Sequence, residues 1–254
     1  CVMGAALAGL SFYGAASWAG TTRALMARLE AAGTAGACPS ALATHFDLRE
    51  LDGLPAPVQR YFRTVLTPGQ PMVTAVSIAL SGRFNLSPTR EQWKPFTSQQ
   101  RILTHRPGFL WDARVLVLPG VVVRVVDSYI AGEGRLRAAL LGLFTVADAH
   151  GGDELARGEF MRYLAEAAWY PTALLPSQGV QWTAVDEASA QATIVDGPLA
   201  LSLLFRFNAA GLIESFRAEA RGAGAGQQMR MLPWEGRWSD YRERDGMRIP
   251  LTGE

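Results

Sequence analysis

Hydrophobic residues follow two different spacings along the chain, and the first of them predicts helices. Residues 1–20 carry no charged side chain, and Leu25, Met26 and Leu29 continue this segment along one helical stripe. A second, shorter helix is predicted over residues 55–66, where apolar side chains recur at spacings of three and four. The residues of that second stripe are Val58, Tyr61, Phe62 and Val65.

From Met72 onward the spacing changes to two, which is typical of strands with one buried face. A helix predicted over residues 153–170 interrupts the strand pattern. Short turn sequences such as Pro119-Gly120 and Arg244-Asp245-Gly246 join neighbouring strands as hairpins. The predicted strands begin near Val76 and continue over residues 96–106, 109–118, 121–130, 135–144, 180–186, 190–195, 200–207, 212–221, 229–242 and 247–251.

This order of elements predicts an α+β fold that is mostly β. Because strand twist accumulates over about ten antiparallel strands, we expect one meander sheet coiled into an open half-barrel and covered by one or two helices. The predicted organisation is an N-terminal hydrophobic helix at residues 1–31, a linker at residues 32–50 and a β half-barrel domain at residues 51–254. An unpaired edge of the sheet would allow a homodimer.

The uncharged N-terminal segment favours a membrane anchor formed by residues 1–22. Roughly 20 apolar residues suffice for a helix to cross a bilayer core, and the first charged residue is Arg23. A signal peptide that is cleaved and a buried helix are the two alternatives. The side of the membrane on which the domain lies stays open.

Composition and charge exclude several classes of protein. With 24 Lys and Arg against 23 Asp and Glu, the net charge of +1 gives no basic patch for nucleic acid, so no nucleic-acid partner is expected. Only two cysteines and three widely separated histidines occur, which argues against a metal site. No nucleotide-binding or hydrolase motif is present, and no cofactor is predicted.

The helix over residues 153–170 carries the candidate catalytic residues Glu159, Arg162 and Glu166. These three side chains share one helical face with Tyr163 and Tyr170. If that face lines a cavity of low dielectric constant, two carboxylates and a guanidinium could transfer protons. The alternative is a ladder of ion pairs on the protein surface, which would contribute little to stability.

Aromatic residues gather in two segments and are the candidate ligand-binding residues. Trp169 and Tyr170 open an apolar run that is unusual for a surface loop, and Trp234 and Trp238 share one strand face across Gly236. On the opposite strand face, Glu235 and Arg237 are predicted to form a surface ion pair. The complete set of candidate ligand-binding residues is Trp111, Tyr163, Trp169, Tyr170, Trp234 and Trp238.

Four segments resemble an uncharacterised bacterial family of membrane-anchored proteins, a domain of unknown function. They read FLWDARV, RVVDSYIAGEGRLRAALLGL, GEFMRYLAEAAWYPTALLPSQG and WEGRWSDYRERDGMRIPLTGE. The resemblance covers roughly residues 52–254 and implies a single N-terminal anchor in a bacterial membrane and a further strand after Glu254. The strand order also looks like the LolA and LolB lipoprotein-carrier fold, a half-barrel that holds acyl chains. Neither resemblance implies a catalytic residue.

Together these patterns predict a membrane-tethered protein that binds a lipid or another hydrophobic ligand in a half-barrel cavity. A cofactor-independent enzyme that acts on a hydrophobic substrate through Glu159, Arg162 and Glu166 is the first alternative. The second alternative is an envelope scaffold that binds a partner protein. Fold analogy alone does not decide between them.

Overall fold

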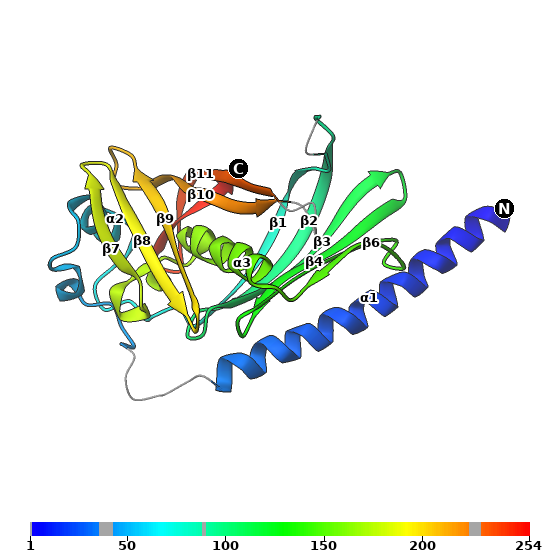
Figure 1. Ribbon diagram of the computed structural model, residues 1–254, viewed down its shortest axis with the longest axis horizontal. Helices are drawn as coiled ribbons and strands as arrows, with labels where there is room; N and C mark the ends of the chain where they lie inside the picture. The colour runs from blue at the N-terminus through cyan, green and yellow to red at the C-terminus, as the bar shows by residue number, and fades with distance from the viewer. Residues whose placement is uncertain (1, 36–42, 88–89, 224–229) are drawn as a thin grey trace. The chain divides into compact units, whose positions relative to one another are not determined.

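The structure is a computed structural model that describes residues 2–35, 43–87, 90–223 and 230–254 (Figure 1). The chain divides into two compact units. Unit 1 comprises Cys1–Gly36 and Ala75–Glu159, and unit 2 comprises Ala37–Thr74 and Phe160–Glu254. Residues 36–42 of the predicted linker at residues 32–50 lie outside the described residues, whereas residues 32–35 end a helix and residues 48–50 begin a 3-10 helix.

Unit 1 is built on a six-stranded antiparallel sheet in which every strand pairs with its neighbour in sequence. Two of its hairpins turn through a non-glycine residue with positive φ followed by glycine, at Ala131-Gly132 and Leu141-Gly142, a geometry that matches the strand twist. The strands are β1 (Ala75–Asn85), β2 (Trp93–Leu103), β3 (Gly108–Leu118), β4 (Val121–Ile130), β5 (Glu133–Leu140) and β6 (Phe144–His150).

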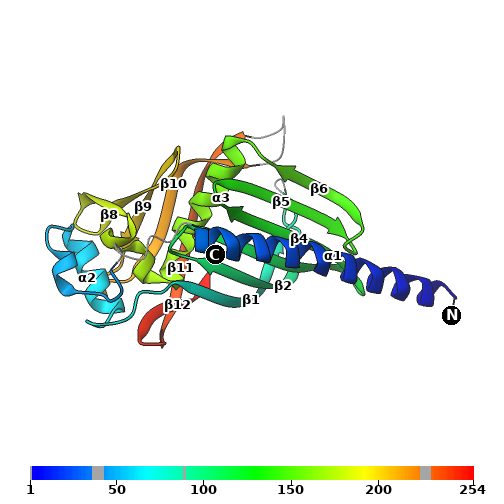
Figure 2. The same cartoon turned by 90° about the horizontal axis from the view of Figure 1, so that it is seen from below.

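Helix α1 (Val2–Ala35) crosses one face of this sheet, as Figures 1 and 2 show, and contacts β2, β3 and β4. Trp18, Leu25 and Leu29 of α1 are buried in one cluster with Leu110 and Val126 of the sheet. The predicted N-terminal hydrophobic helix is therefore present, and its stripe at Leu25 and Leu29 faces the sheet. Among the residues that the structure describes, no helix combines the length and the hydropathy that crossing a membrane requires.

Unit 2 contains a second six-stranded antiparallel sheet with the order β12-β11-β10-β9-β8-β7. Its strands are β7 (Gln181–Asp186), β8 (Ser189–Asp196), β9 (Leu199–Phe207), β10 (Ile213–Ala223), β11 (Arg230–Arg244) and β12 (Met247–Gly253). Among the described residues of unit 2, the helical segments are α2 (Ala56–Val65), the end of α3 (Asp153–Ala165) and four short 3-10 helices, η1 (Leu48–Leu51), η2 (Glu166–Trp169), η3 (Pro171–Leu174) and η4 (Pro176–Gln178).

An aromatic core joins α2 to the sheet of unit 2. Tyr61 and Phe62 of α2 are fully buried, and their rings lie 5.7 Å from Phe207 and 6.4 Å from Trp182 respectively. Trp182 of β7 lies 5.6 Å from Phe205 of β9 and donates its indole N–H to the carbonyl oxygen of Leu174 at 2.9 Å. The predicted stripe over residues 55–66 is thus the buried face of α2.

The predicted fold class is confirmed, because the chain is mostly β and its strands form antiparallel meanders preceded by a helix. The strands are divided between two sheets, whereas the strand pattern in the sequence predicts one. The division falls at helix α3 (Asp153–Ala165), which begins in unit 1 and ends in unit 2. The half-barrel stays a prediction.

Several element boundaries differ from the prediction by a few residues, and two of the differences change an element. The predicted strand over residues 135–144 is a hairpin, because Leu141 adopts a φ of 55° and lets β6 fold back on β5. Leucine is an unusual residue for this backbone conformation, so the sequence carries no strong turn signal there. The predicted helix over residues 153–170 is α-helical to Ala165 and continues as the 3-10 helix η2.

Candidate functional site

Four aromatic rings form a row in unit 2 that includes three of the predicted ligand-binding tryptophans. Trp169 of η2 packs edge-on against Trp238 of β11, with ring centroids 4.8 Å apart. Phe216 of β10 continues the row, 6.2 Å from Trp238 and 4.7 Å from Trp234. We call Trp169, Trp238, Phe216 and Trp234 the aromatic row.

Two glycines make room for these rings. Strand alternation places Trp234, Gly236 and Trp238 on one face of β11, as predicted. Gly236 is the register partner of Phe216, and a Cβ at Gly236 would overlap the Phe216 ring. Gly253 of β12 is the partner of Trp238, and a Cβ there would overlap the indole. Gly236, which lies between the two tryptophans, therefore leaves room for the ring of Phe216 on the neighbouring strand β10.

The two middle rings of the aromatic row are buried in unit 2, and the two end rings, those of Trp169 and Trp234, are half-buried. Trp238 is only 7% exposed, Trp234 is half-buried, and Leu232 on the same face of β11 is 48% exposed. The guanidinium carbon of Arg221 lies 4.2 Å from the Trp234 ring centroid, a cation–π geometry. The indole N–H of Trp238 is buried and has no hydrogen-bond partner among the described residues.

Tyr163 and Tyr170, two further predicted ligand-binding residues, belong to the packed interior. Their rings lie 5.6 Å apart, and the Tyr170 hydroxyl donates to the carbonyl oxygen of Tyr163 at 2.6 Å. Burial is the main cause that raises the pKa of both phenols well above the ordinary value, so both stay neutral at physiological pH. Trp111, the last of the set, belongs to unit 1, where it is buried with its ring 6.0 Å from Phe96.

The candidate catalytic residues are largely withdrawn from solvent. Arg162 Nε donates to Glu166 Oε1 at 2.7 Å, and these side chains are only 14% and 12% exposed. Glu159 is buried. These three side chains therefore do not form the exposed ladder of ion pairs that was the alternative. Their catalytic role stays a prediction. The predicted surface pair of Glu235 and Arg237 is confirmed, with 3.6 Å between its charged atoms and both side chains exposed.

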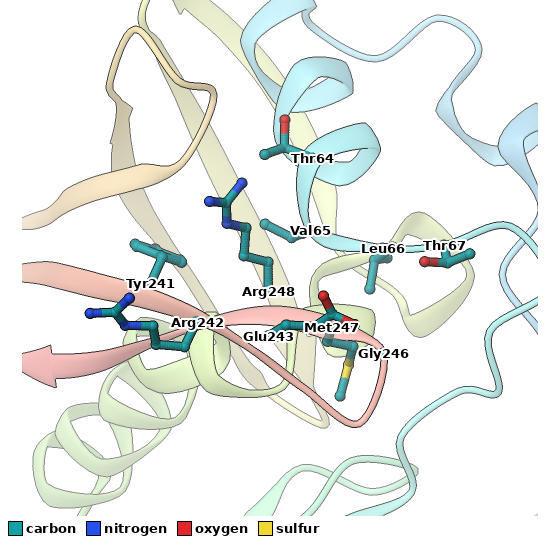
Figure 3. A pocket seen from close by; sticks show the side chains of 10 residues that line it. All are labelled: Thr64, Val65, Leu66, Thr67, Tyr241, Arg242, Glu243, Gly246, Met247 and Arg248. Carbon is teal, nitrogen blue, oxygen red and sulfur yellow. The ribbon is translucent and has the colours of Figure 1, made fainter.

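A pocket of about 480 Å³ lies elsewhere in unit 2, between the end of α2 and the β11–β12 hairpin (Figure 3). Residues 64–67, 241–243 and 246–248 line it, and none of the predicted site residues is among them. We call it the α2 pocket. The Asp245-Gly246 turn signal predicts the hairpin, but no local signal indicates that α2 lies beside it, because the two segments are far apart in the sequence.

Comparisons with known proteins identify a family and no activity. The model of a protein family described as being of unknown function matches residues 52–254. This match confirms the prediction of an uncharacterised domain with nearly the same bounds. No curated protein and no solved structure shows a significant match to the chain.

Proposed function

The chain belongs to DUF6920, a family of unknown function, and we propose that it binds a lipid or another hydrophobic ligand at the aromatic row of unit 2. The observation that carries the proposal is the continuous apolar face of β11. This face leads from the buried Trp238 through the half-buried Trp234 to the exposed Leu232. A ligand that lies along this face would bury aromatic and aliphatic surface at about 25 cal/mol per Å².

The outer end of the row supports binding more than it supports simple core packing. Trp234 is half-buried, and the guanidinium of Arg221 lies over its ring. An aromatic surface beside a guanidinium suits an amphiphile, whose apolar part packs on rings and whose polar end remains near water.

The buried indole N–H of Trp238 is a second supporting feature. A buried donor without a protein partner costs about 1–3 kcal/mol unless water or a ligand supplies an acceptor. A ligand that carries a carbonyl or ester oxygen would supply the acceptor that the described residues do not provide. Fatty acids and acyl esters combine such an oxygen with an apolar chain.

The proposal includes contact with a membrane through residues 1–22. Phe12 and Tyr13 are 79% and 67% exposed on α1, and Leu10 is also exposed. Exposed aromatic and aliphatic side chains on a helical segment without charge favour a lipid surface. Vesicle flotation of the full chain tests this part, because Phe12→Ser with Tyr13→Ser is expected to reduce the bound fraction several-fold. Equal flotation of the variant and the wild-type protein would contradict it.

The ligand proposal is tested by native mass spectrometry of the full chain and by titration with a dansyl-labelled fatty acid. We expect a bound lipid mass and saturable fluorescence enhancement. Trp234→Ala is expected to weaken binding by roughly 10-fold or more, because burying a large apolar side chain contributes about 1.5–3 kcal/mol. Trp93→Ala, which removes an exposed indole from β2, is the matched control and is expected to change binding by less than about twofold.

Two results would overturn the proposal. A mass that stays unshifted when lipids are added would favour the scaffold, whose surface binds a partner protein. Equal binding by Trp234→Ala and Trp93→Ala would show that the aromatic row is not the binding surface. The enzyme alternative predicts a different result, in which Glu166→Gln retains the ligand and abolishes its conversion.

A further inference from the structure

The α2 pocket contains a guanidinium that no neighbouring carboxylate neutralises. Arg248 of β12 is the register partner of Glu243 of β11, so their Cβ atoms lie close together. Among the described residues, Arg248 nevertheless forms no ion pair. Figure 3 shows its side chain directed across the pocket toward Thr64 and Val65 of α2. Arg248 is exposed, so the donors of this guanidinium are available to a ligand in the pocket.

The second arginine of the pocket is already paired, so Arg248 is the group that attracts an anion. Arg242 Nη2 lies 2.9 Å from Asp240 Oδ1, and both side chains are largely exposed. A guanidinium presents its N–H groups as a fork that fits the two oxygens of a carboxylate or phosphate group. The free fork of Arg248 therefore has the geometry to bind such a group through two hydrogen bonds.

Hydroxyl groups complete the polar lining. The Tyr241 hydroxyl donates to the carbonyl oxygen of Ile213 at 2.8 Å, and the Thr64 hydroxyl donates to that of Arg60 at 2.8 Å. These two donors are used, and their oxygens remain acceptors. The Thr67 hydroxyl forms no side-chain hydrogen bond to another described residue, so it can donate to a ligand.

Buried apolar residues of α2 lie behind these groups. Val65 and Leu66 are buried apart from the surface they give to the pocket, and Tyr61 lies one helical turn earlier on the same face of α2. The Tyr61 hydroxyl is buried without a partner among the described residues. Burial above all, and the nearby Tyr241, raise the pKa of Tyr61 well above the ordinary value. A neutral phenol at this position adds no charge that would repel an anion.

We propose that the α2 pocket binds a small organic molecule that carries a carboxylate or phosphate group, with Arg248 holding that group. The volume of about 480 Å³ lies within the range of small-molecule sites and exceeds the size of a free inorganic ion. Glu243, the second charged group without an ion pair among the described residues of the pocket, accepts a hydrogen bond from a hydroxyl or ammonium group of the same molecule. This site is separate from the aromatic row.

Isothermal titration of the full chain with malate, glycerol 3-phosphate and inorganic phosphate tests the proposal. We expect malate or glycerol 3-phosphate to bind with a Kd below about 1 mM and more tightly than inorganic phosphate. Arg248→Gln is expected to weaken that binding by about 10-fold or more, because it removes both the positive charge and the paired N–H donors of the guanidinium. Arg63→Gln replaces an exposed arginine of α2 outside the pocket lining and is the matched control, with less than about twofold change.

The titration distinguishes a carboxylate ligand from a phosphate ligand, and several of its outcomes would contradict the proposal. Preference for malate assigns a carboxylate, and preference for glycerol 3-phosphate assigns a phosphate group. Absence of binding by all three probes at about 10 mM, or equal binding by Arg248→Gln and Arg63→Gln, would overturn the proposal. Inorganic phosphate that binds as tightly as the organic probes would also contradict it. Trp234→Ala is expected to leave this titration unchanged, so the result does not depend on the aromatic row.

Discussion

Trp18 of α1 donates its indole N–H to Oδ1 of Asp112 on β3 at 2.9 Å, which joins residues 94 positions apart in the sequence. Trp18 is fully buried, and the guanidinium carbon of Arg137 lies 5.5 Å from its ring centroid. This contact combines apolar burial with one directional hydrogen bond. It therefore specifies how α1 lies on the sheet of unit 1, which apolar burial alone would leave less defined.

Asp112→Ala is expected to loosen α1, because it leaves the buried indole N–H without its acceptor. The cost of such an unsatisfied donor is about 1–3 kcal/mol. Asp112→Asn keeps an oxygen at this position and is the matched control, with a smaller effect. Hydrogen–deuterium exchange of the α1 amides in the full chain measures the difference. Equal protection of α1 in both variants would show that the hydrogen bond contributes nothing to docking.

Asp112 also predicts a dependence of unit 1 stability on pH. Burial is the largest influence on its carboxyl group and raises its pKa above the ordinary 3.8, although the Trp18 hydrogen bond and the charges of Arg124 and Arg114 act in the opposite direction. Between 3.8 and the raised folded pKa, the folded state binds more protons than the unfolded state. The contribution of Asp112 to stability is therefore fully present below 3.8 and is lost as the pH rises through the folded pKa.

The measurement is urea denaturation of the wild-type protein and Asp112→Asn at a series of pH values. The difference between their free energies of unfolding isolates this group, because the other titrating groups are common to both. Wild type is expected to lose stability relative to Asp112→Asn as the pH rises above 3.8, and the difference then becomes constant. A difference that changes in the opposite direction would contradict the raised pKa.

Gly14 and Gly20 give a matched pair for testing the docking of α1. A Cβ at Gly14 would overlap the carbonyl oxygen of Leu141, whereas a Cβ at Gly20 would meet nothing within 4 Å. Gly14→Ala is expected to destabilise the protein by about 1–3 kcal/mol through overpacking. Gly20→Ala is expected to stabilise it by up to about 1 kcal/mol through helix propensity. Thermal denaturation followed by circular dichroism checks the opposite signs, and a shift of Tm in the same direction for both would refute the docked geometry.

Arg162 and Glu166 provide a test of how strongly a largely buried pair stabilises unit 2. Glu166→Gln is expected to cost roughly 1–3 kcal/mol, because it leaves the Arg162 guanidinium with a weaker partner in a place where water has little access. Glu235→Gln removes a carboxylate from the exposed pair with Arg237 and is expected to change stability by less than about 0.5 kcal/mol. Chemical denaturation gives both values, and equal costs would show that burial of the Arg162 pair has no energetic consequence.

Local patterns determined a large part of this fold. The alternation around Trp234, Gly236 and Trp238 predicted one shared strand face, and the structure places the aromatic row there. The turn residues Asp245 and Gly246 predicted the last hairpin, since both adopt the positive φ values that such turns require. These features were predictable because strand periodicity and turn geometry depend on residues a few positions apart.

Tertiary structure alone decided the division into two sheets, the docking of α1 and the position of the α2 pocket. Residues 1–20 carry no charge and give no local signal for the surface on which their helix packs, and only the complementary faces around Trp18 and Asp112 place it on a sheet. The direction in which Arg248 points likewise depends on α2, which is far from it in the sequence. A sequence pattern identifies which side chains need burial or a partner, but which distant segment supplies it depends on the packing of the whole chain.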